Sequence, residues 1–185
     1  MSVLKNRKIA VLVAVVVIVV ATFFGVNASV SRLTGDIERL FFDGVYIESE
    51  GYMQPSINSQ IAKQADAALN LATLLQIYPG WESASEAGLN ARRVLLDAEG
   101  ISEKSRAQHE MEQALVILVE ATYRSTELGE REIDAVAQHW KSYQGASGYI
   151  EGTLAPDYNN KVDEFYNQLS IIAALITGIA PEYYR

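Results

Sequence analysis

The sequence of 185 residues contains no cysteine, only two histidines and only four prolines. Without cysteine it has no disulfide, no thiol nucleophile and no cysteine-linked lipid, so a folded domain must be held together by packing alone. His109 and His139 lie in no Glu-x-x-His or His-Glu-x-x-His motif. Such motifs supply the ligands of di-iron bundles and zinc proteases. We therefore expect no metal centre of either kind.

Other catalytic signatures are also missing. The chain has no Gly-x-Ser-x-Gly turn, no Walker loop and no dinucleotide-binding fingerprint. Its densest acidic clusters, within residues 127–134 and at residues 163–164, are typical of solvated helix faces, with a weak cation site as the alternative. We predict that the protein is not an enzyme and holds no cofactor or metal.

Basic residues are outnumbered, 15 Lys and Arg against 23 Asp and Glu. Three of the basic residues, Lys5, Arg7 and Lys8, come before residue 9. The part after residue 26 has the other 12 and all 23 acidic residues, a net charge of −11. Nucleic acids and anionic lipid surfaces bind to basic patches. We expect neither to be a partner of this acidic part.

One stretch lacks charge altogether: Ile9 to Val26, eighteen residues reading IAVLVAVVVIVVATFFGV. A helix rises about 1.5 Å per residue, so this stretch spans roughly 27 Å, close to a hydrocarbon core of about 30 Å. In lipid the backbone must satisfy its own hydrogen bonds, which favours helix even for valine. We predict a transmembrane helix over residues 9–26. Its representative membrane-spanning residues are Ile9, Val13, Val17, Val20 and Phe24.

The flanking charges predict the orientation of this helix. Basic residues are enriched on the cytoplasmic side of membrane helices. We therefore expect residues 1–8 in the cytoplasm and residues 27–185 on the periplasmic or extracellular side of a cytoplasmic (inner) membrane, crossed once. The alternative is a signal peptide cleaved after Ala28. The apolar run of residues 9–26 is, however, longer than the apolar h-region of a usual signal peptide, which has roughly 7–15 residues. Small-residue pairs such as Ala10/Ala14 would permit self-association in lipid.

The remainder is rich in alanine and in apolar residues spaced by three and four, with Gly and Pro at the boundaries, which indicates helices. We predict an all-α fold: an N-terminal transmembrane helix, then an elongated antiparallel bundle of four to five helices. Residues 27–55 would form a membrane-proximal helix and connector, and residues 56–185 the exported bundle. The predicted helices cover residues 29–47, 56–78, 81–99, 102–128, 130–149 and 156–177.

Local signals refine these boundaries. Gly51 and Pro55 break the chain, and Gly100 is expected to end a helix in the left-handed conformation. Ser102 is expected to cap the next helix. Residues 145–156 contain three glycines and a proline, and are compatible with either a break or one long kinked helix. The most regular apolar seam steps by four and three through Ala107, Met111, Ala114, Leu118, Ala121, Ser125 and Leu128.

The last third of the chain carries a recognisable pattern. It reads YNNKV at residues 158–162, FYN at 165–167, an apolar run ending at Gly178, and PEYY at 181–184. This resembles the YN-x-x-V-x-x-YN block and the Pro-aromatic ending of the LemA family. The second Tyr-Asn pair is displaced by one residue, and Arg124 stands where the family's E-x-YP signature has proline. The resemblance implies one N-terminal membrane helix, an exported, elongated antiparallel helical bundle, and no catalytic residues.

Tyrosines concentrate in the same region, and tyrosine is enriched at interfaces. The alternative is structural: the rings cap the ends of the bundle and the asparagine amides cross-link helices. The apolar run of residues 169–180 is too short to span a membrane, so it would be a core helix or an interfacial segment. The candidate interaction or interfacial residues are Tyr158, Asn159, Tyr166, Asn167, Tyr183 and Tyr184.

These observations favour a non-enzymatic envelope protein, anchored by the lipid bilayer, that serves as a scaffold or interaction module. Its partners would be other envelope proteins or itself, since long helical faces suit side-by-side contacts. Two alternatives stay open. One is a ligand-sensing bundle that works with a partner; the other is a self-assembling, membrane-organising or filament-forming protein.

Overall fold

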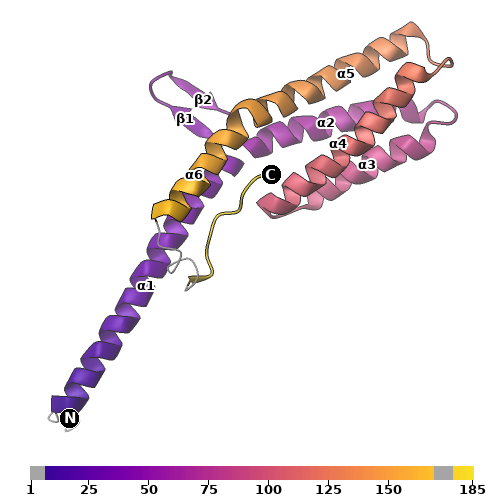
Figure 1. Ribbon diagram of the computed structural model, residues 1–185. Helices are drawn as coiled ribbons and strands as arrows, with labels where there is room; N and C mark the ends of the chain where they lie inside the picture. Colours follow the sequence, from indigo (N-terminus) through magenta and orange to yellow (C-terminus); the bar gives the residue numbers. More distant parts are fainter. Residues whose placement is uncertain (1–6, 169–176) are drawn as a thin grey trace. The chain divides into compact units, whose positions relative to one another are not determined.

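The computed structural model describes residues 7–168 and 177–185, and it confirms the all-α prediction (Figure 1). Within these residues the chain forms two compact units. The first contains residues up to 38 together with residues 162–181, and the second contains residues 39–161 together with residues 182–185. Most of the apolar run at residues 169–180 lies outside the described residues, so its predicted role stays a prediction. The elements are α1 (Arg7–Phe42), β1 (Val45–Ile47), β2 (Tyr52–Gln54), α2 (Ile57–Gln76), α3 (Glu82–Asp97), α4 (Ile101–Arg124), α5 (Glu130–Tyr149), the π-helix η2 (Ile150–Leu154) and α6 (Ala155–Gln168).

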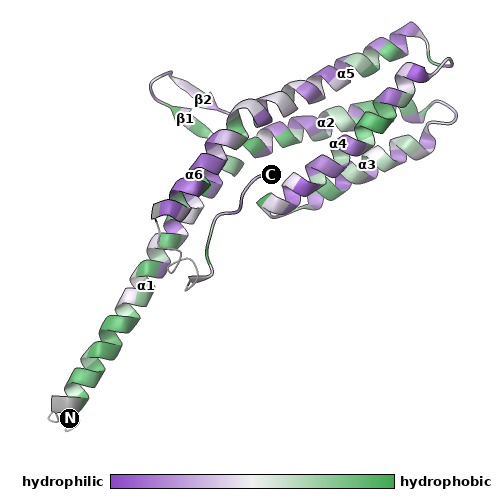
Figure 2. Ribbon diagram, in the orientation of Figure 1, coloured by the Kyte–Doolittle hydropathy of each residue, from purple (hydrophilic) through white to green (hydrophobic). Residues whose placement is uncertain are grey.

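Helix α1 is one uninterrupted helix of 36 residues. The predicted membrane-proximal helix is continuous with the apolar helix as far as Phe42. Helix α1 is long and apolar enough to cross a membrane, a property that a signal sequence can share. Its first half is almost entirely hydrophobic (Figure 2). The helix ends five residues earlier than predicted, at Phe42, because Gly44 adopts a positive φ of 81° that no helix continues through.

The connector between α1 and α2 is a small β-hairpin, where the positions of Gly51 and Pro55 predict only a break in the chain. Strands β1 and β2 pair antiparallel, with Tyr46 opposite Met53. Gly51, at φ 66°, closes the turn by donating its N–H to the Ile47 carbonyl oxygen at 2.8 Å. A strand of three residues is too short to show the alternation of apolar and polar residues by which strands are recognised in a sequence. Gly51 and Pro55 therefore predict only breaks.

The second unit contains a bundle built from α2, α3, α4 and α5. Helix α2 packs against both α3 and α5, and α3 packs against α4 (Figure 1). The short loops between successive helices make neighbours antiparallel. Helix α2 begins after Ser56, whose hydroxyl accepts the Ser59 N–H at 3.0 Å. The apolar residues of α2 that are spaced by three and four are buried: Ile57, Ile61, Ala65, Ala68, Leu71, Ala72 and Leu75.

Two boundaries around α4 differ from the sequence prediction. Gly100 is not left-handed: it has φ −78° and precedes α4 as its N-cap residue. Helix α4 ends at Arg124 rather than Leu128. Its buried face includes Leu115, Val119 and Thr122, whereas Ala121 of the predicted seam is exposed. The predicted seam was wrong at Ala121 because α4 packs mainly on α3. The position of α3 determines which face of α4 is buried, and the sequence of α4 does not show that position.

The question left open at residues 145–156 is answered by a π-helix. Helices α5 and α6 are joined by η2 without a break in helical structure. Pro156 has no N–H, so the Gly152 carbonyl cannot receive the usual bond from four residues ahead. The chain accommodates this with the wider turn: the Ala155 N–H donates to the Ile150 carbonyl, five residues back.

Gly44→Ala should destabilise the protein far more than Gly51→Ala. Both glycines have positive φ, which costs alanine about 1–2 kcal/mol. At Gly44 the new Cβ would also lie 2.4 Å from the Gln54 carbonyl oxygen, whereas at Gly51 no atom lies within 4 Å. Urea denaturation of the full chain in detergent, followed by circular dichroism, measures the difference. Equal losses of stability would show that the close approach at Gly44 does not constrain the hairpin.

Candidate functional site

The first candidate surface is the apolar part of α1. The five representative membrane-spanning residues are all exposed, from 37% at Ile9 to 65% at Phe24. Soluble proteins seldom leave so long an apolar surface in contact with water. This surface therefore has the properties of a lipid-facing helix, as predicted from its composition.

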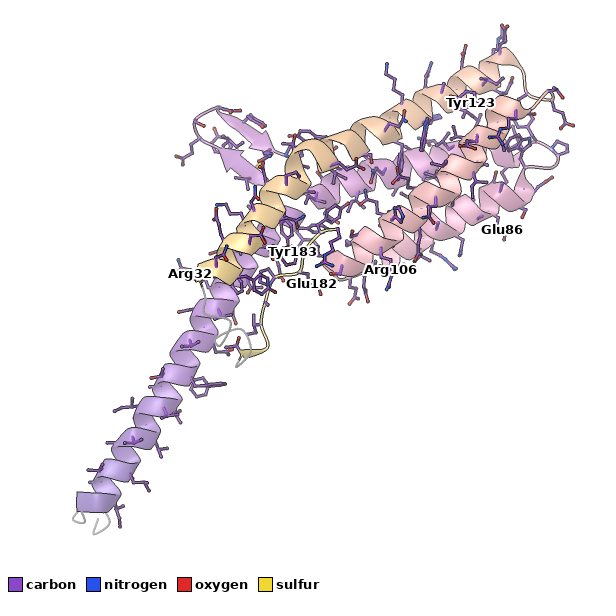
Figure 3. The ribbon with its side chains drawn as sticks, in the orientation of Figure 1. Arg32, Glu86, Arg106, Tyr123, Glu182 and Tyr183 are labelled. Atoms are coloured by element: carbon purple, nitrogen blue, oxygen red, sulfur yellow. The ribbon has the colours of Figure 1, made fainter. Side chains whose placement is uncertain are left out.

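The second candidate surface is in the second unit and includes residues 182–185, called the 182–185 segment below. This segment lies against the start of α4 (Figure 3). The Ser102 N–H donates to the Glu182 carboxylate at 2.9 Å. The first N–H groups of a helix lack partners within the helix, and its N-terminus attracts negative charge. Ser102 was predicted to cap α4 but lies within its first turn, because the helix begins at Ile101. The carboxylate that satisfies this helix end comes from eighty residues away.

The start of α6 holds the same segment through Tyr158 and Asn159. The Asn159 side chain pairs with both backbone groups of Tyr184: its Nδ2 donates to the carbonyl at 2.8 Å, and its Oδ1 accepts the N–H at 3.1 Å. The Tyr158 hydroxyl donates to the Glu182 carbonyl at 2.7 Å. The Tyr184 hydroxyl donates to the Gln108 side chain on α4. The asparagine therefore replaces the pairing that a neighbouring β-strand would provide.

Aromatic packing surrounds these hydrogen bonds. The Phe41 ring centroid lies 6.0 Å from that of Tyr158 and 5.9 Å from that of Tyr184. All three side chains are buried. Such ring pairs contribute about 0.5–1.5 kcal/mol beyond the area they bury. Phe41 lies in the predicted helix of residues 29–47, and nothing in its local sequence indicates an aromatic partner more than a hundred residues away.

Three of the six candidate interaction residues therefore meet at one place: Tyr158, Asn159 and Tyr184. Their polar groups bind other parts of the same chain, which fits the structural alternative stated for them. Tyr166 lies elsewhere, in the first unit, and its hydroxyl donates to the Pro181 carbonyl at 3.3 Å. Asn167 is exposed, and Tyr183 is half-buried beneath the Arg185 guanidinium, whose carbon lies 5.7 Å from the ring centroid.

The pKa values of two buried tyrosine hydroxyls in the second unit, those of Tyr143 and Tyr184, are raised. Burial is the main cause of the raised pKa of Tyr143, and the nearby Glu112, Tyr184 and Glu151 raise it further. The pKa of Tyr184 is also raised, first by burial and then by Glu151 and Glu112. A buried phenolate beside carboxylates is doubly unfavourable. Both hydroxyls therefore stay protonated over the physiological range.

The described residues contain no cluster of possible metal ligands. Among residues 7–168 and 177–185, no group of three or more His, Cys, Asp or Glu side chains is arranged to hold a metal ion. His109 is exposed, and its ring contacts the Gln113 amide through Nε2 at 2.9 Å. Over the residues that the structure describes, the fold is that of an all-α protein with one helix long and apolar enough to cross a membrane. The sequence matches no family model, and no curated protein is significantly similar to it.

Asn159→Ala should release the 182–185 segment, whereas Asn160→Ala should not. Asn160 is adjacent and exposed, so it is a matched control. The first substitution leaves the Tyr184 N–H and carbonyl without their partner, which should cost about 1–3 kcal/mol. Hydrogen exchange should become faster at the Tyr184 and Ser102 amides, and the midpoint of thermal unfolding should fall. Identical exchange in the two variants would show that the asparagine does not hold the segment.

Proposed function

We propose that the protein is a non-enzymatic, membrane-anchored scaffold or interaction module on the outer side of a cytoplasmic membrane. The observation that carries the proposal is the exposed apolar surface of α1 between residues 9 and 26. A span of this length matches the hydrocarbon thickness. The basic residues before it and the acidic majority after it support an N-terminus inside and the bundle outside.

The hairpin supports the interaction part of the proposal. Tyr46 and Met53 are a cross-strand pair and are 57% and 60% exposed. Aromatic residues and methionine are enriched in protein interfaces. A two-stranded hairpin is also marginally stable by itself. We infer that another envelope protein packs on this pair; a second copy of the chain is the alternative partner.

Membership of the LemA family is a further part of the proposal. It is supported by the YNNKV, FYN and PEYY segments and is compatible with the all-α fold. The internal bonds of Tyr158, Asn159 and Tyr184 suggest that this pattern maintains the bundle, with the partner surface elsewhere. No activity or partner follows from the family pattern.

Single-cysteine labelling should report both the anchor and its orientation. The chain has no cysteine, so Ser2→Cys and the exposed Ser83→Cys each introduce one thiol. A membrane-impermeant maleimide added to intact cells should label Ser83→Cys at least about tenfold more than Ser2→Cys, because the bilayer protects the N-terminus. After lysis both should react, and both chains should remain in membranes after alkaline extraction.

Two results would contradict the anchor. A mature chain that begins at Ser29 and washes free of membranes would identify the apolar run as a cleaved signal peptide. Preferential labelling of Ser2→Cys in intact cells would reverse the orientation.

Site-specific photocrosslinking tests the interaction surface. A photoreactive amino acid at Tyr46 or Met53 should capture a discrete protein in native membranes, because those side chains face a partner. The same amino acid at the exposed Glu86 of α3 should give at least about fivefold less product. Capture of the chain itself identifies self-association. Equal yields at all three positions would exclude the hairpin as the preferred surface.

A further inference from the structure

The exposed face of α4 has no role in the surfaces described above. It is a row of residues spaced by four and three, all exposed except the half-buried Ala114, and we call it the α4 outer face: Glu110, Ala114, Ile117, Ala121 and Arg124. At its centre, Ile117 is 67% exposed, and no other large hydrophobic side chain in the described helices α2 to α5 is as exposed. Apolar residues at this spacing are typical of the contact between two packed helices.

Two open hollows lie along this face, one at each end. The hollow at the start of α4 has a volume of about 520 Å³ and includes Glu110 in its lining. The hollow at the end of α4 has a volume of about 460 Å³ and includes Ala121 and Arg124. Only α3, α4 and the adjoining loops line them, and α3 and α4 lie side by side (Figure 1). A helix of another chain could therefore lie along α4 with its side chains in both hollows.

The charges at the two ends of the face stand in opposite order. Arg106 and Glu110 line the first hollow, and Arg124 and Glu127 line the second. Glu110 lies seven residues before Ile117 and Arg124 seven after it, whereas Arg106 lies eleven before it and Glu127 ten after it. Two antiparallel copies of α4, related by a two-fold axis at Ile117, would place Glu110 opposite Arg124 and Arg106 opposite Glu127.

The remaining charges are compatible with this pairing. Asp97 and Glu103 also line the first hollow and make it acidic, so it attracts Arg124 of a second copy. Arg124 already contacts the Glu120 carboxylate of its own chain at 3.0 Å, but that pair is exposed. A guanidinium has five N–H donors, so it can bind a second carboxylate as well. No described residue forms an ion pair with Glu110.

This order of charges favours one occupant over the others. A uniformly acidic partner would be repelled by the carboxylates of the first hollow, and a uniformly basic partner would meet Arg106 and Arg124. A symmetric pair brings no like charges opposite each other on the α4 outer face. An interface in which one patch contacts the same patch of another subunit is the usual form of a two-fold dimer.

We propose that the α4 outer face binds a second copy of this chain, as an antiparallel two-fold pair centred on Ile117. The apolar centre excludes water, and the two kinds of charge pair determine the register. The contact between Glu110 and Arg124 extends over fourteen residues, about 21 Å of helix. The proposal goes beyond the scaffold proposal because it requires neither the hairpin nor an orientation in the membrane.

Single-cysteine cross-linking in native membranes tests the two-fold axis. The chain has no cysteine, and Ile117→Cys would place the two new thiols together on the axis. Facing Cα atoms of packed helices come within the roughly 4.4–6.8 Å that a disulfide requires. After oxidation, Ile117→Cys should give at least about fivefold more disulfide-linked dimer than Tyr123→Cys.

Tyr123 is a matched control because it is also an exposed residue of α4, labelled in Figure 3. It lies six residues after Ile117, which places it about 120° around the helix. Co-expression of Glu110→Cys with Arg124→Cys should give more cross-linked dimer than either variant does by itself, because the two positions face each other only between copies.

Sedimentation of the full chain in detergent measures the strength of the pair. Ile117→Glu should weaken dimerisation about tenfold or more, because it buries a charge in the apolar centre. Tyr123→Glu should leave the dimer unchanged. Arg124→Glu and Glu110→Arg should each weaken it severalfold, since like charges then face each other. The double variant should recover most of the lost affinity, because its charges are complementary again.

Several results would overturn the proposal. These are a chain that stays monomeric at every concentration tested, a dimer that Ile117→Glu does not weaken, and equal cross-linking of Ile117→Cys and Tyr123→Cys. Failure of the double variant to recover would reject the antiparallel register. Capture of a different protein by Ile117→Cys in place of a second copy would reject self-association at this face. None of these outcomes bears on the membrane anchor or on the hairpin, so the two proposals can fail separately.

Discussion

Burial of the apolar face of α2 is the interaction on which the second unit depends. This helix packs against both α3 and α5, and each fully buried Leu or Ile contributes about 1.5–3 kcal/mol. Small residues permit close contact: a Cβ at Gly88 of α3 would lie 3.6 Å from the Leu115 side chain and 3.8 Å from Ala72. Because three helices meet there, the position of α4 follows from the packing of α2 and α3. The chain achieves this without any disulfide.

The 182–185 segment is held on this frame mainly by polar bonds. Its Glu182 carboxylate satisfies the start of α4, and its Tyr184 backbone pairs with Asn159 at the start of α6. Residues far apart in sequence thereby determine one another's geometry. Glu112, Glu151 and Tyr184 line a cavity beside the same segment. One short stretch of chain thus connects the start of α4 with the start of α6.

The apolar part of α1 and the bundle differ in the side chains that they expose. The first half of α1 exposes almost entirely apolar side chains, whereas the bundle buries most of its apolar residues and exposes charge (Figure 2). In the proposed setting, lipid covers the first and water surrounds the second. The hairpin comes between them along the chain and exposes Tyr46 and Met53. Their exposure as a cross-strand pair is the reason for assigning the hairpin a partner.

The sequence by itself determined the helices, because periodicity and Gly or Pro punctuation act over a few residues: α2 and α5 were predicted to within two residues of their ends. It also determined the apolar span and the absence of cysteine chemistry. Only the tertiary structure decided what caps α4, what buries Phe41 and which polar groups surround the cavity. Glu182 lies eighty residues from Ser102, and Glu151 about forty from Glu112. The two residues of each pair come together only when the helices pack. A pattern within a few residues of the sequence does not show which distant residues will meet.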